Sequence, residues 1–234
     1  MDLELLHFFQ YKQGYRYNSD SLLLADFILK EGIKSEVLDV GSGCGIIGIL
    51  LKKNISSLDL NLLDIQEENI KLIKKNLEYN SLEAKVFCED FKNFNPLKKF
   101  DFIVSNPPFY RQGAQLGNDS HKNISKFREF LPLEIFIEKS YRLLKPRGIL
   151  YFCYESMALS EICALLEKNN IKIIKICFVY KDIKSKSRLV LIKARKGVKS
   201  SCEIVAPFLM YENNHLSDKM NEICLRFGIK SYDI

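Results

Sequence analysis

The fold of this chain is decided by one stretch, Val37-Leu38-Asp39-Val40-Gly41-Ser42-Gly43-Cys44-Gly45-Ile46-Ile47-Gly48. An apolar strand runs into a glycine-rich turn and then directly into a helix. Glycines are needed in such a turn because side chains would keep a ligand away from the backbone and from the N-terminus of the helix. The stretch therefore predicts a ligand site at a strand–turn–helix junction.

Outward from this turn, short β-branched runs alternate with amphipathic stretches. The expected strands are Glu36–Val40, Leu58–Asp64, Lys85–Glu89, Phe100–Ser105, Ile149–Tyr154, Ile171–Tyr180 and Arg188–Ala194, and the clearest helices are Glu67–Tyr79, Leu133–Leu144 and Met157–Lys168. This alternation predicts an α/β fold, one domain over residues 1–234, with a seven-stranded, mostly parallel sheet between helices. The last two strands are too close in sequence to enclose a helix, so we expect an antiparallel hairpin at that end of the sheet.

Composition excludes several classes of protein. With 47% hydrophobic and 27% charged residues among 234, the chain can bury a core, and it is not collagen-like, low-complexity or wholly disordered. No apolar run approaches the length of a membrane span, and the acidic start of the chain argues against a secretory signal. The seven cysteines show no C-x-x-C spacing and the three histidines lie far apart. We therefore expect reduced thiols in a cytoplasmic protein, with no metal site and no membrane partner.

The glycine turn is compatible with two kinds of ligand. Gly43, Gly45 and Gly48 fit the G-x-G-x-x-G pattern of dinucleotide sites, and Asp64 follows at the end of the next strand. Taken alone, this pattern suits either NAD or an adenosyl ligand without a pyrophosphate. Asp39 separates the two, because its carboxylate would repel a pyrophosphate and suit a cationic amine and sulfonium.

With Asp39 included, the pattern D-x-G-x-G-x-G resembles the first motif of class I S-adenosylmethionine-dependent methyltransferases. The resemblance implies a Rossmann-like methyltransferase fold that binds S-adenosylmethionine at Asp39, Gly41, Gly43 and Gly45. It also implies that Asp64 holds the ribose hydroxyls, and that Asp90 and Phe91, after the third strand, hold the adenine. A carboxylate can accept hydrogen bonds from hydroxyls or from an exocyclic amine, so both roles are chemically sound.

A second motif, Asn106-Pro107-Pro108-Phe109, follows the fourth strand. A simple Pro-Pro strand terminator would explain the prolines but not the flanking Asn and Phe. The tetrapeptide resembles the (D/N)-P-P-(Y/F) motif of methyltransferases that act on planar amino or amide nitrogens, which are poor nucleophiles. By that resemblance, the Asn106 side-chain oxygen and the Pro107 carbonyl accept the two amino hydrogens. Phe109 would then stack on the base.

The segment before the first motif suggests the substrate. Residues 10–25, with Gly14-Tyr15-Arg16-Tyr17-Asn18-Ser19-Asp20, resemble the opening motif of the bacterial family that methylates N6 of adenine 37 in valine tRNA. The resemblance continues at Leu143–Gly148, where Arg147 replaces a glycine, and at Pro207–Ser217. It implies that residues 1–35 close the cofactor and substrate site, with Tyr17, Ser19 and Asp20 at the cofactor, and that residues 36–234 form the catalytic core.

Other functions remain open at this stage. The same chemistry serves N2 of a guanine in ribosomal RNA and protein glutamine. However, glutamine methyltransferases usually carry a separate N-terminal helical domain, for which about 35 residues leave no room, and DNA enzymes usually carry a recognition domain. A NAD-dependent oxidoreductase and a non-catalytic RNA-binding module are the alternatives from other classes. The first rests on the glycine pattern, and intact Asp39 and Asn106 argue against the second.

The net charge of +6 is concentrated in two segments. Residues 111–128 hold four basic side chains and one acid, and residues 181–199 hold eight and one. Such runs are often solvated faces, and lysines on an edge strand also prevent aggregation. Because an extruded base requires the backbone to be gripped outside the pocket, we expect them to contact tRNA, at the anticodon stem-loop of a monomeric enzyme. The expected substrate-binding residues are Tyr110, Arg111, Lys122, Arg128, Lys193 and Arg195.

Overall fold

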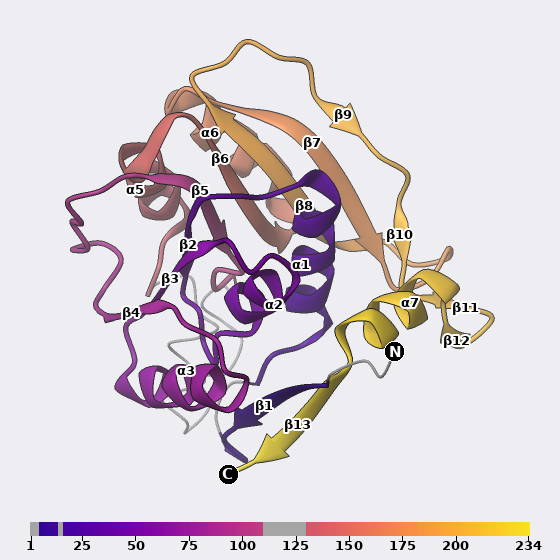
Figure 1. The fold of residues 1–234 in the computed structure, drawn as a ribbon. Helices are drawn as coiled ribbons and strands as arrows, with labels where there is room; N and C mark the ends of the chain where they lie inside the picture. Colours follow the sequence, from indigo (N-terminus) through magenta and orange to yellow (C-terminus); the bar gives the residue numbers. More distant parts are fainter. Residues whose placement is uncertain (1–4, 14–15, 110–129) are drawn as a thin grey trace.

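The computed structural model describes residues 5–13, 16–109 and 130–234. A large mixed sheet runs through the molecule with helices on both faces (Figure 1). Its strands lie in the order β10-β7-β8-β6-β5-β2-β3-β4, and β9 pairs with the outer edge of β7. The central strands are β2 (Glu36–Val40), β3 (Asp59–Asp64), β4 (Lys85–Cys88), β5 (Phe100–Ser105), β6 (Leu144–Glu155), β7 (Ile171–Tyr180) and β8 (Ser187–Lys196).

The predicted α/β fold is confirmed. Strands β2 to β6 are parallel to one another, and β8 runs antiparallel between β6 and β7. The seven expected strands are all present, although β6 begins at Leu144, five residues before the expected start. Arg147 there adopts a left-handed conformation with φ 62°. That geometry explains why a glycine is common at this position in the family that the sequence resembles.

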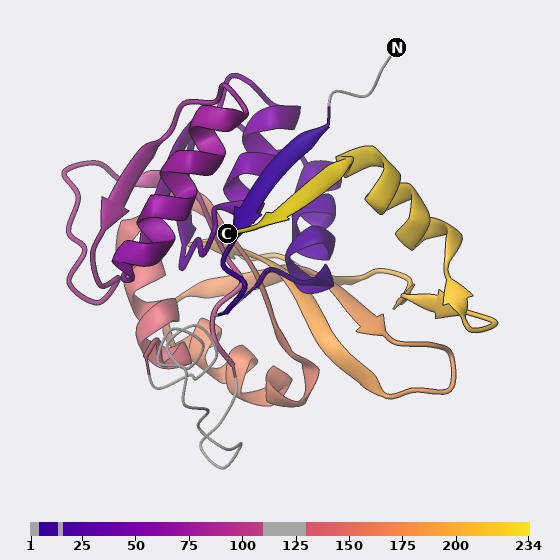
Figure 2. The ribbon, with the colours of Figure 1, turned by 90° about the horizontal axis from the view of Figure 1, so that it is seen from below.

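Side chains on alternate sides of each strand build two cores. On one face, Val37, Leu60 and Leu62 pack against α1 (Ser19–Glu31), α2 (Ile46–Asn54) and α3 (Glu67–Tyr79). On the other, Leu38 and Leu63 pack against α5 (Leu133–Leu143) and α6 (Leu159–Lys168). A short 3₁₀ turn, η1 (Ser156–Ala158), precedes α6, so the helix expected from Met157 starts two residues later. Figure 2 shows the two helical layers on either side of the sheet.

The chain termini form a ribbon that the sequence did not predict. β1 (Leu6–Gln10) pairs in parallel with β13 (Ile229–Asp233), outside the main sheet. The two strands lie side by side in Figure 2, and α3 contacts β1. Shorter elements precede β13: β9 (Glu203–Ile204), β10 (Phe208–Leu209), the hairpin of β11 (Tyr211–Glu212) and β12 (His215–Leu216), and helix α7 (Asp218–Phe227).

The order of the strands positions the site. From β2 the chain moves outward to β3 and β4, then returns to β5 on the other side of β2. A ligand crevice is expected where the strand order reverses in this way, beyond the carboxyl ends of the strands. Gly41 follows β2 and Asn106 follows β5, so the two motifs singled out in the sequence flank this reversal.

Candidate active site

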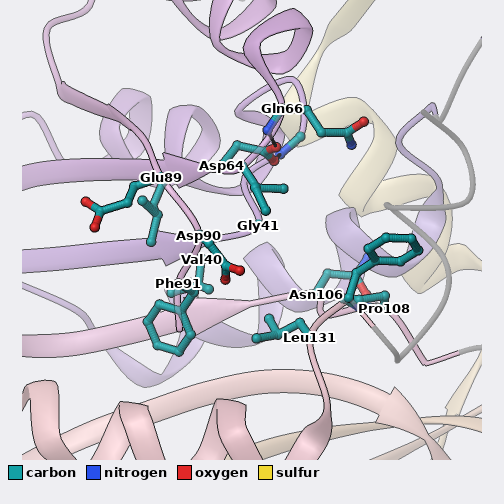
Figure 3. Close-up of a pocket in the computed structure, with 14 residues that line it drawn as sticks. Val40, Gly41, Asp64, Gln66, Glu89, Asp90, Phe91, Asn106, Pro108 and Leu131 are labelled. Atoms are coloured by element: carbon teal, nitrogen blue, oxygen red, sulfur yellow. Dashed lines mark hydrogen bonds between the residues drawn. The ribbon is translucent and has the colours of Figure 1, made fainter. Parts of the chain in front are cut away.

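Two adjoining cavities lie at the carboxyl ends of β2, β3, β4 and β5. The larger, about 630 Å³ including its open mouth, is shown in Figure 3. The smaller, about 350 Å³, lies on the side of α1 and α2. Gly41, Gly43 and Asn106 line both cavities. The remaining lining residues of the larger cavity are Val40, Leu63, Asp64, Ile65, Gln66, Glu89, Asp90, Phe91, Pro108, Phe130 and Leu131.

The glycine turn is held in shape by the neighbouring strand. The Gly41 and Ser42 amides donate to the Leu63 carbonyl oxygen, at 2.9 and 3.1 Å. Gly41 and Gly43 both have positive φ, 66° and 58°, a conformation that L side chains rarely adopt. The turn thus brings bare backbone to the border between the two cavities, as the sequence predicted for a ligand-binding junction.

Asp64 joins the turn to the cavity. It is 5% exposed, and its Oδ2 accepts a hydrogen bond from the Gly43 amide at 2.8 Å. Its Oδ1 accepts from the Gln66 amide and from Asn69 Nδ2. The carboxylate is therefore fixed in direction at the end of β3, on the wall of the larger cavity.

Asp90 and Phe91 supply a second polar and apolar pair after β4. The Asp90 carboxylate accepts from the Lys92 amide at 2.9 Å, which orients the loop. In Figure 3 that carboxylate lies on the Asn106 side of the cavity, whereas the Glu89 carboxylate points away from it. Phe91 is buried against Phe136, with ring centroids 6.1 Å apart. Carboxylates beside an apolar wall fit a ligand that combines hydroxyls and an amine with a flat ring, so the residues present fit S-adenosylmethionine.

Asp39 lies elsewhere than we expected. It alternates with Leu38 along β2 and therefore faces α2, where its Oδ2 accepts from the Gly48 amide at 2.9 Å. The side chain is 1% exposed and lines neither cavity. Burial raises the pKa of Asp39 to about 7, the Gly48 hydrogen bond opposes this, and the charge of Asp64 adds to it. Asp39 thus braces the turn from behind and does not line the cavity.

This geometry weighs against the NAD alternative. A pyrophosphate at such a turn uses the free amides at the N-terminus of the helix. Here the Gly48 amide in the first turn of α2 is taken by Asp39, and the Gly43 amide by Asp64. The two amides are therefore already paired with carboxylates and are not free to bind a dianionic ligand.

The proline motif presents Asn106 at the border between the cavities. Its Nδ2 donates to Ser21 Oγ of α1 at 3.2 Å, and its Oδ1 accepts from the Cys153 thiol of β6 at 3.1 Å. The preceding Ser105 anchors the strand end by donating to the Val40 carbonyl at 2.8 Å. Pro107 is buried, and the half-buried Phe109 ring packs edge-on against Tyr154 with centroids 5.6 Å apart.

Of the expected closing residues, Tyr17 lies at the site and Asp20 does not. Tyr17 lines the smaller cavity, and its hydroxyl lies 2.5 Å from Ser231 Oγ of β13. Asp20 is 1% exposed and forms an ion pair with Arg188 at 2.5 Å, away from both cavities. Asp20 therefore fixes the start of α1 to β8. The half-buried Ser19 begins α1 and lines neither cavity.

The expected substrate-binding residues fall into two groups. Tyr110, Arg111, Lys122 and Arg128 lie outside the described residues. Lys193 faces α1, where its ammonium pairs with Glu31 at 2.8 Å, and its side chain is only 13% exposed. Arg195 pairs in register with Ile149, near the amino ends of the parallel strands, and its Nε donates to the Arg147 carbonyl. The alternation and direction of β8 carry both side chains away from the edge that holds Asn106.

Sequence reasoning missed several residues at the site. Ser21 lies within the N-terminal motif, and Gln66 and Glu89 lie next to expected strand ends. The sequence therefore indicated that this part of the chain is near the site, but not that these three residues line it. Cys153 lies in an apolar run and carried no local signal. Among the described residues, no three His, Cys, Asp or Glu side chains gather as metal ligands would. In the same part of the chain, no helix has the length and apolar character needed to cross a bilayer.

Comparison with known proteins identifies the family. The methyltransferase small domain profile matches residues 16–169. A tRNA1(Val) (adenine(37)-N6)-methyltransferase of Flavobacterium johnsoniae is 27% identical over 83% of this chain and 84% of its own. A release factor glutamine methyltransferase of Flavobacterium psychrophilum is 28% identical over 74% of this chain and 65% of its own.

Solved structures share the fold. A predicted O-methyltransferase of Agrobacterium tumefaciens superposes with a TM-score of 0.70 at 16% identity, over 92% of this chain and all of the other. A T. thermophilus 16S rRNA N2 G1207 methyltransferase, crystallised with S-adenosylmethionine and guanosine, gives a TM-score of 0.57 at 21% identity, over 77% of this chain and 44% of its own. The profile match covers well over half of the chain, and the cavity fits the cofactor. The chain belongs to the methyltransferase small domain family and is a class I S-adenosylmethionine-dependent methyltransferase.

Proposed function

We propose that the chain methylates the exocyclic N6 of an adenine in tRNA, at position 37 of a valine tRNA. The observation that carries the proposal is the placement of Asn106, which lines both the larger cavity and the smaller cavity beside α1. The Flavobacterium relative with the corresponding name aligns with most of both chains, which supports the same target. The glutamine methyltransferase aligns with less of its own length and leaves about a third of it unmatched.

The residues at the junction suit an amino nitrogen whose lone pair is delocalised into a ring. S-adenosylmethionine, when bound, supplies an electrophilic methyl group. The Asn106 Oδ1 and the Pro107 carbonyl would accept the two amino hydrogens, which frees the lone pair to point at the methyl carbon. Phe109 would stack on the extruded base. Asn106 carries no charge, so positioning and hydrogen bonding, more than proton removal, would supply the rate.

The cofactor would lie against the residues that the turn and the strand ends bring together. Gly41, Gly43 and Gly45 would allow its close approach, Asp64 would hold ribose hydroxyls, and Asp90 with Phe91 would hold the adenine. Tyr17 would close the smaller cavity. Asp39 would act indirectly, by bracing the turn.

The remaining parts of the proposal concern the partner and the setting. We propose that the enzyme acts as a single domain and a monomer in the cytoplasm, on the anticodon stem-loop of the tRNA. The absence of any disulfide among the seven cysteines supports a reducing compartment.

The direct test is methyl transfer to unmodified transcripts, read by mass spectrometry of the digested nucleosides. We expect N6-methyladenosine in valine tRNA and none when adenine 37 is replaced by guanine. Ribosomal RNA fragments and a release-factor protein serve as alternative substrates. A methylated guanine or glutamine, with no methylated adenine in any tRNA, would refute the proposal.

A further inference from the structure

The basic segment of residues 181–199 is folded back on itself, and its two halves lie at opposite ends of the sheet. Tyr180 pairs with Ser187, so residues 181–186 form the turn that joins β7 to β8. β7 runs parallel to β5 and β6, which places this turn beyond the carboxyl edge, on the same edge as Asn106. β7 is three strands from β5, so the lateral separation is about 14 Å.

The lysines of the turn form no ion pairs among the described residues, whereas two of the three lysines in the distal half are engaged. Lys181, Lys184 and Lys186 are exposed and form no ion pair among the described residues, although the charge of Lys181 acts on the neighbouring Asp182 carboxylate. By contrast, Lys193 is paired with Glu31, and Lys196 donates to the carbonyls of Tyr141 and Leu144. Of the segment's four exposed lysines without an ion pair among the described residues, three therefore lie at the edge that carries Asn106, and the fourth, Lys199, lies at the opposite edge.

The turn holds these lysines on a defined backbone. Asp182 Oδ1 accepts from the Lys184 amide at 2.9 Å and from the Ser185 hydroxyl at 2.8 Å, and the Ser185 amide donates to the Asp182 carbonyl. The Tyr211 amide donates to the Lys181 carbonyl at 2.8 Å, which ties the turn to the C-terminal region. Cations on a fixed turn lose less entropy on binding than cations on a mobile one.

Two exposed apolar side chains flank the lysines. Ile183, in the turn, is 77% exposed, and Met157 of η1 is 90% exposed. η1 contacts the start of β8, where Ser156 Oγ donates to the Ser187 carbonyl at 2.5 Å. Ribose and base faces of a bound RNA would give these two side chains apolar area to cover.

We propose that the β7–β8 turn, through Lys181, Lys184 and Lys186, grips the phosphate backbone of the RNA whose base is held at Asn106. The inference rests on the proposed function, because it requires an RNA substrate. The proposed phosphate contacts lie at the opposite end of the β7–β8 hairpin from Lys193 and Arg195. The inference is carried by charge complementarity: three lysines without ion pairs lie on the edge where the reactive base would be held, and phosphates are their natural partners.

The test is a matched pair of triple charge reversals. One variant replaces Lys181, Lys184 and Lys186 with Glu. The control replaces Lys34, Lys99 and Lys199 with Glu, which makes the same change in net charge at exposed positions on the amino edge. Affinity for the valine tRNA transcript is measured by fluorescence anisotropy at several salt concentrations. Calorimetry with S-adenosylhomocysteine checks that each variant has kept its cofactor site.

We expect the turn variant to lose affinity by at least about tenfold and the slope of log K against log salt to fall by about 2 to 3. Replacement of the same lysines with Arg should preserve both values. Equal slopes for the turn variant, the control and the wild type would overturn the inference, even if the wild type methylates tRNA. Failure of the wild type to bind or methylate any tRNA would instead refute the proposed function.

Discussion

The Cys153 thiol donates a hydrogen bond to the side-chain oxygen of Asn106, with 3.1 Å between Sγ and Oδ1. Cys153 is fully buried, and burial raises the pKa of its thiol well above the usual value, so the thiol keeps the proton that it donates. From the other side, Asn106 Nδ2 donates to Ser21 Oγ. Together these contacts fix the amide with its oxygen toward β6 and its nitrogen toward α1. β6 and α1 therefore both control the orientation of the residue that would orient the substrate.

Replacement of Asn106 with Ala should abolish transfer and leave cofactor affinity within a few-fold of the wild type. The reason is that Asn106 is proposed to accept an amino hydrogen of the substrate, whereas Asp64 and Asp90 are proposed to hold the cofactor. Single-turnover methylation of tRNA and calorimetry with S-adenosylhomocysteine measure the two properties separately. Full transfer at saturating cofactor, with only the affinity reduced, would show that Asn106 serves the cofactor instead.

Replacement of Cys153 with Ala should lower kcat by roughly tenfold, because the Asn106 amide loses one of the two contacts that orient it. Cofactor affinity should not change. Cys153→Ser retains a donor of similar size and should restore most of the rate. If Ala and Ser variants lose activity equally, the thiol is needed for packing and not for orienting Asn106.

The central fold was predictable because its signals are local. Strands β2 to β5 and β7 begin and end within about a residue of the apolar runs, and α3 begins and ends where its periodicity does. β1 and β13 escaped prediction because they pair with one another across almost the whole chain, and five-residue strands carry no local signal for such a partner. The motifs indicated which residues lie near the strand ends, but not the side that each residue faces. Asp39 faces α2 and Lys193 faces α1, orientations that follow from the alternation along their strands.

Asp39 should make stability depend on pH. Burial raises its folded pKa to about 7, above the 3.8 of an ordinary aspartate. The unfolded chain therefore ionises first, so this group lowers stability progressively as pH rises from about 4 to 7, and its cost is constant above that. Asp39→Asn can still accept from Gly48 and has no charge to bury. We expect its stability relative to the wild type to improve by about 1–3 kcal/mol between pH 5 and pH 8, measured by urea unfolding. A difference that does not change with pH would contradict the raised pKa.

Lys193 should act in stability and not in RNA binding. Burial opposes ionisation of Glu31, but hydrogen bonds from Lys175 and Lys193 outweigh it and lower its pKa. Replacement of Lys193 with Met keeps the apolar stem and removes one of these bonds, so the free energy of unfolding should fall by about 1 kcal/mol. The difference should shrink as the pH falls through the folded pKa of Glu31, where the carboxylate is lost. The salt slope of tRNA binding should match that of the wild type, and a slope lower by about 1 would restore Lys193 as a phosphate contact.

The terminal ribbon should contribute to cofactor binding through its contacts with the N-terminal motif. Tyr17 lines the smaller cavity and is held by Ser231, while the adjacent Arg16 pairs with Asp233 at 2.7 Å. Deletion of residues 229–234 removes both contacts and the only strand partner of β1 among the described residues. We expect a lower melting temperature and a cofactor affinity reduced by about tenfold or more, measured by calorimetry with S-adenosylhomocysteine.

Point variants separate a local effect on Tyr17 from general destabilisation by the deletion. Ser231→Ala removes only the hydroxyl partner and should weaken cofactor binding by a few-fold with little change in melting temperature. Lys230→Ala is the matched control, because Lys230 is exposed in the same strand and makes no described bond to Arg16 or Tyr17. If both point variants bind cofactor as the wild type does while the deletion does not, the ribbon stabilises the fold without positioning Tyr17. A reduced affinity for Ser231→Ala alone would show that the C-terminal strand helps to close the cofactor site.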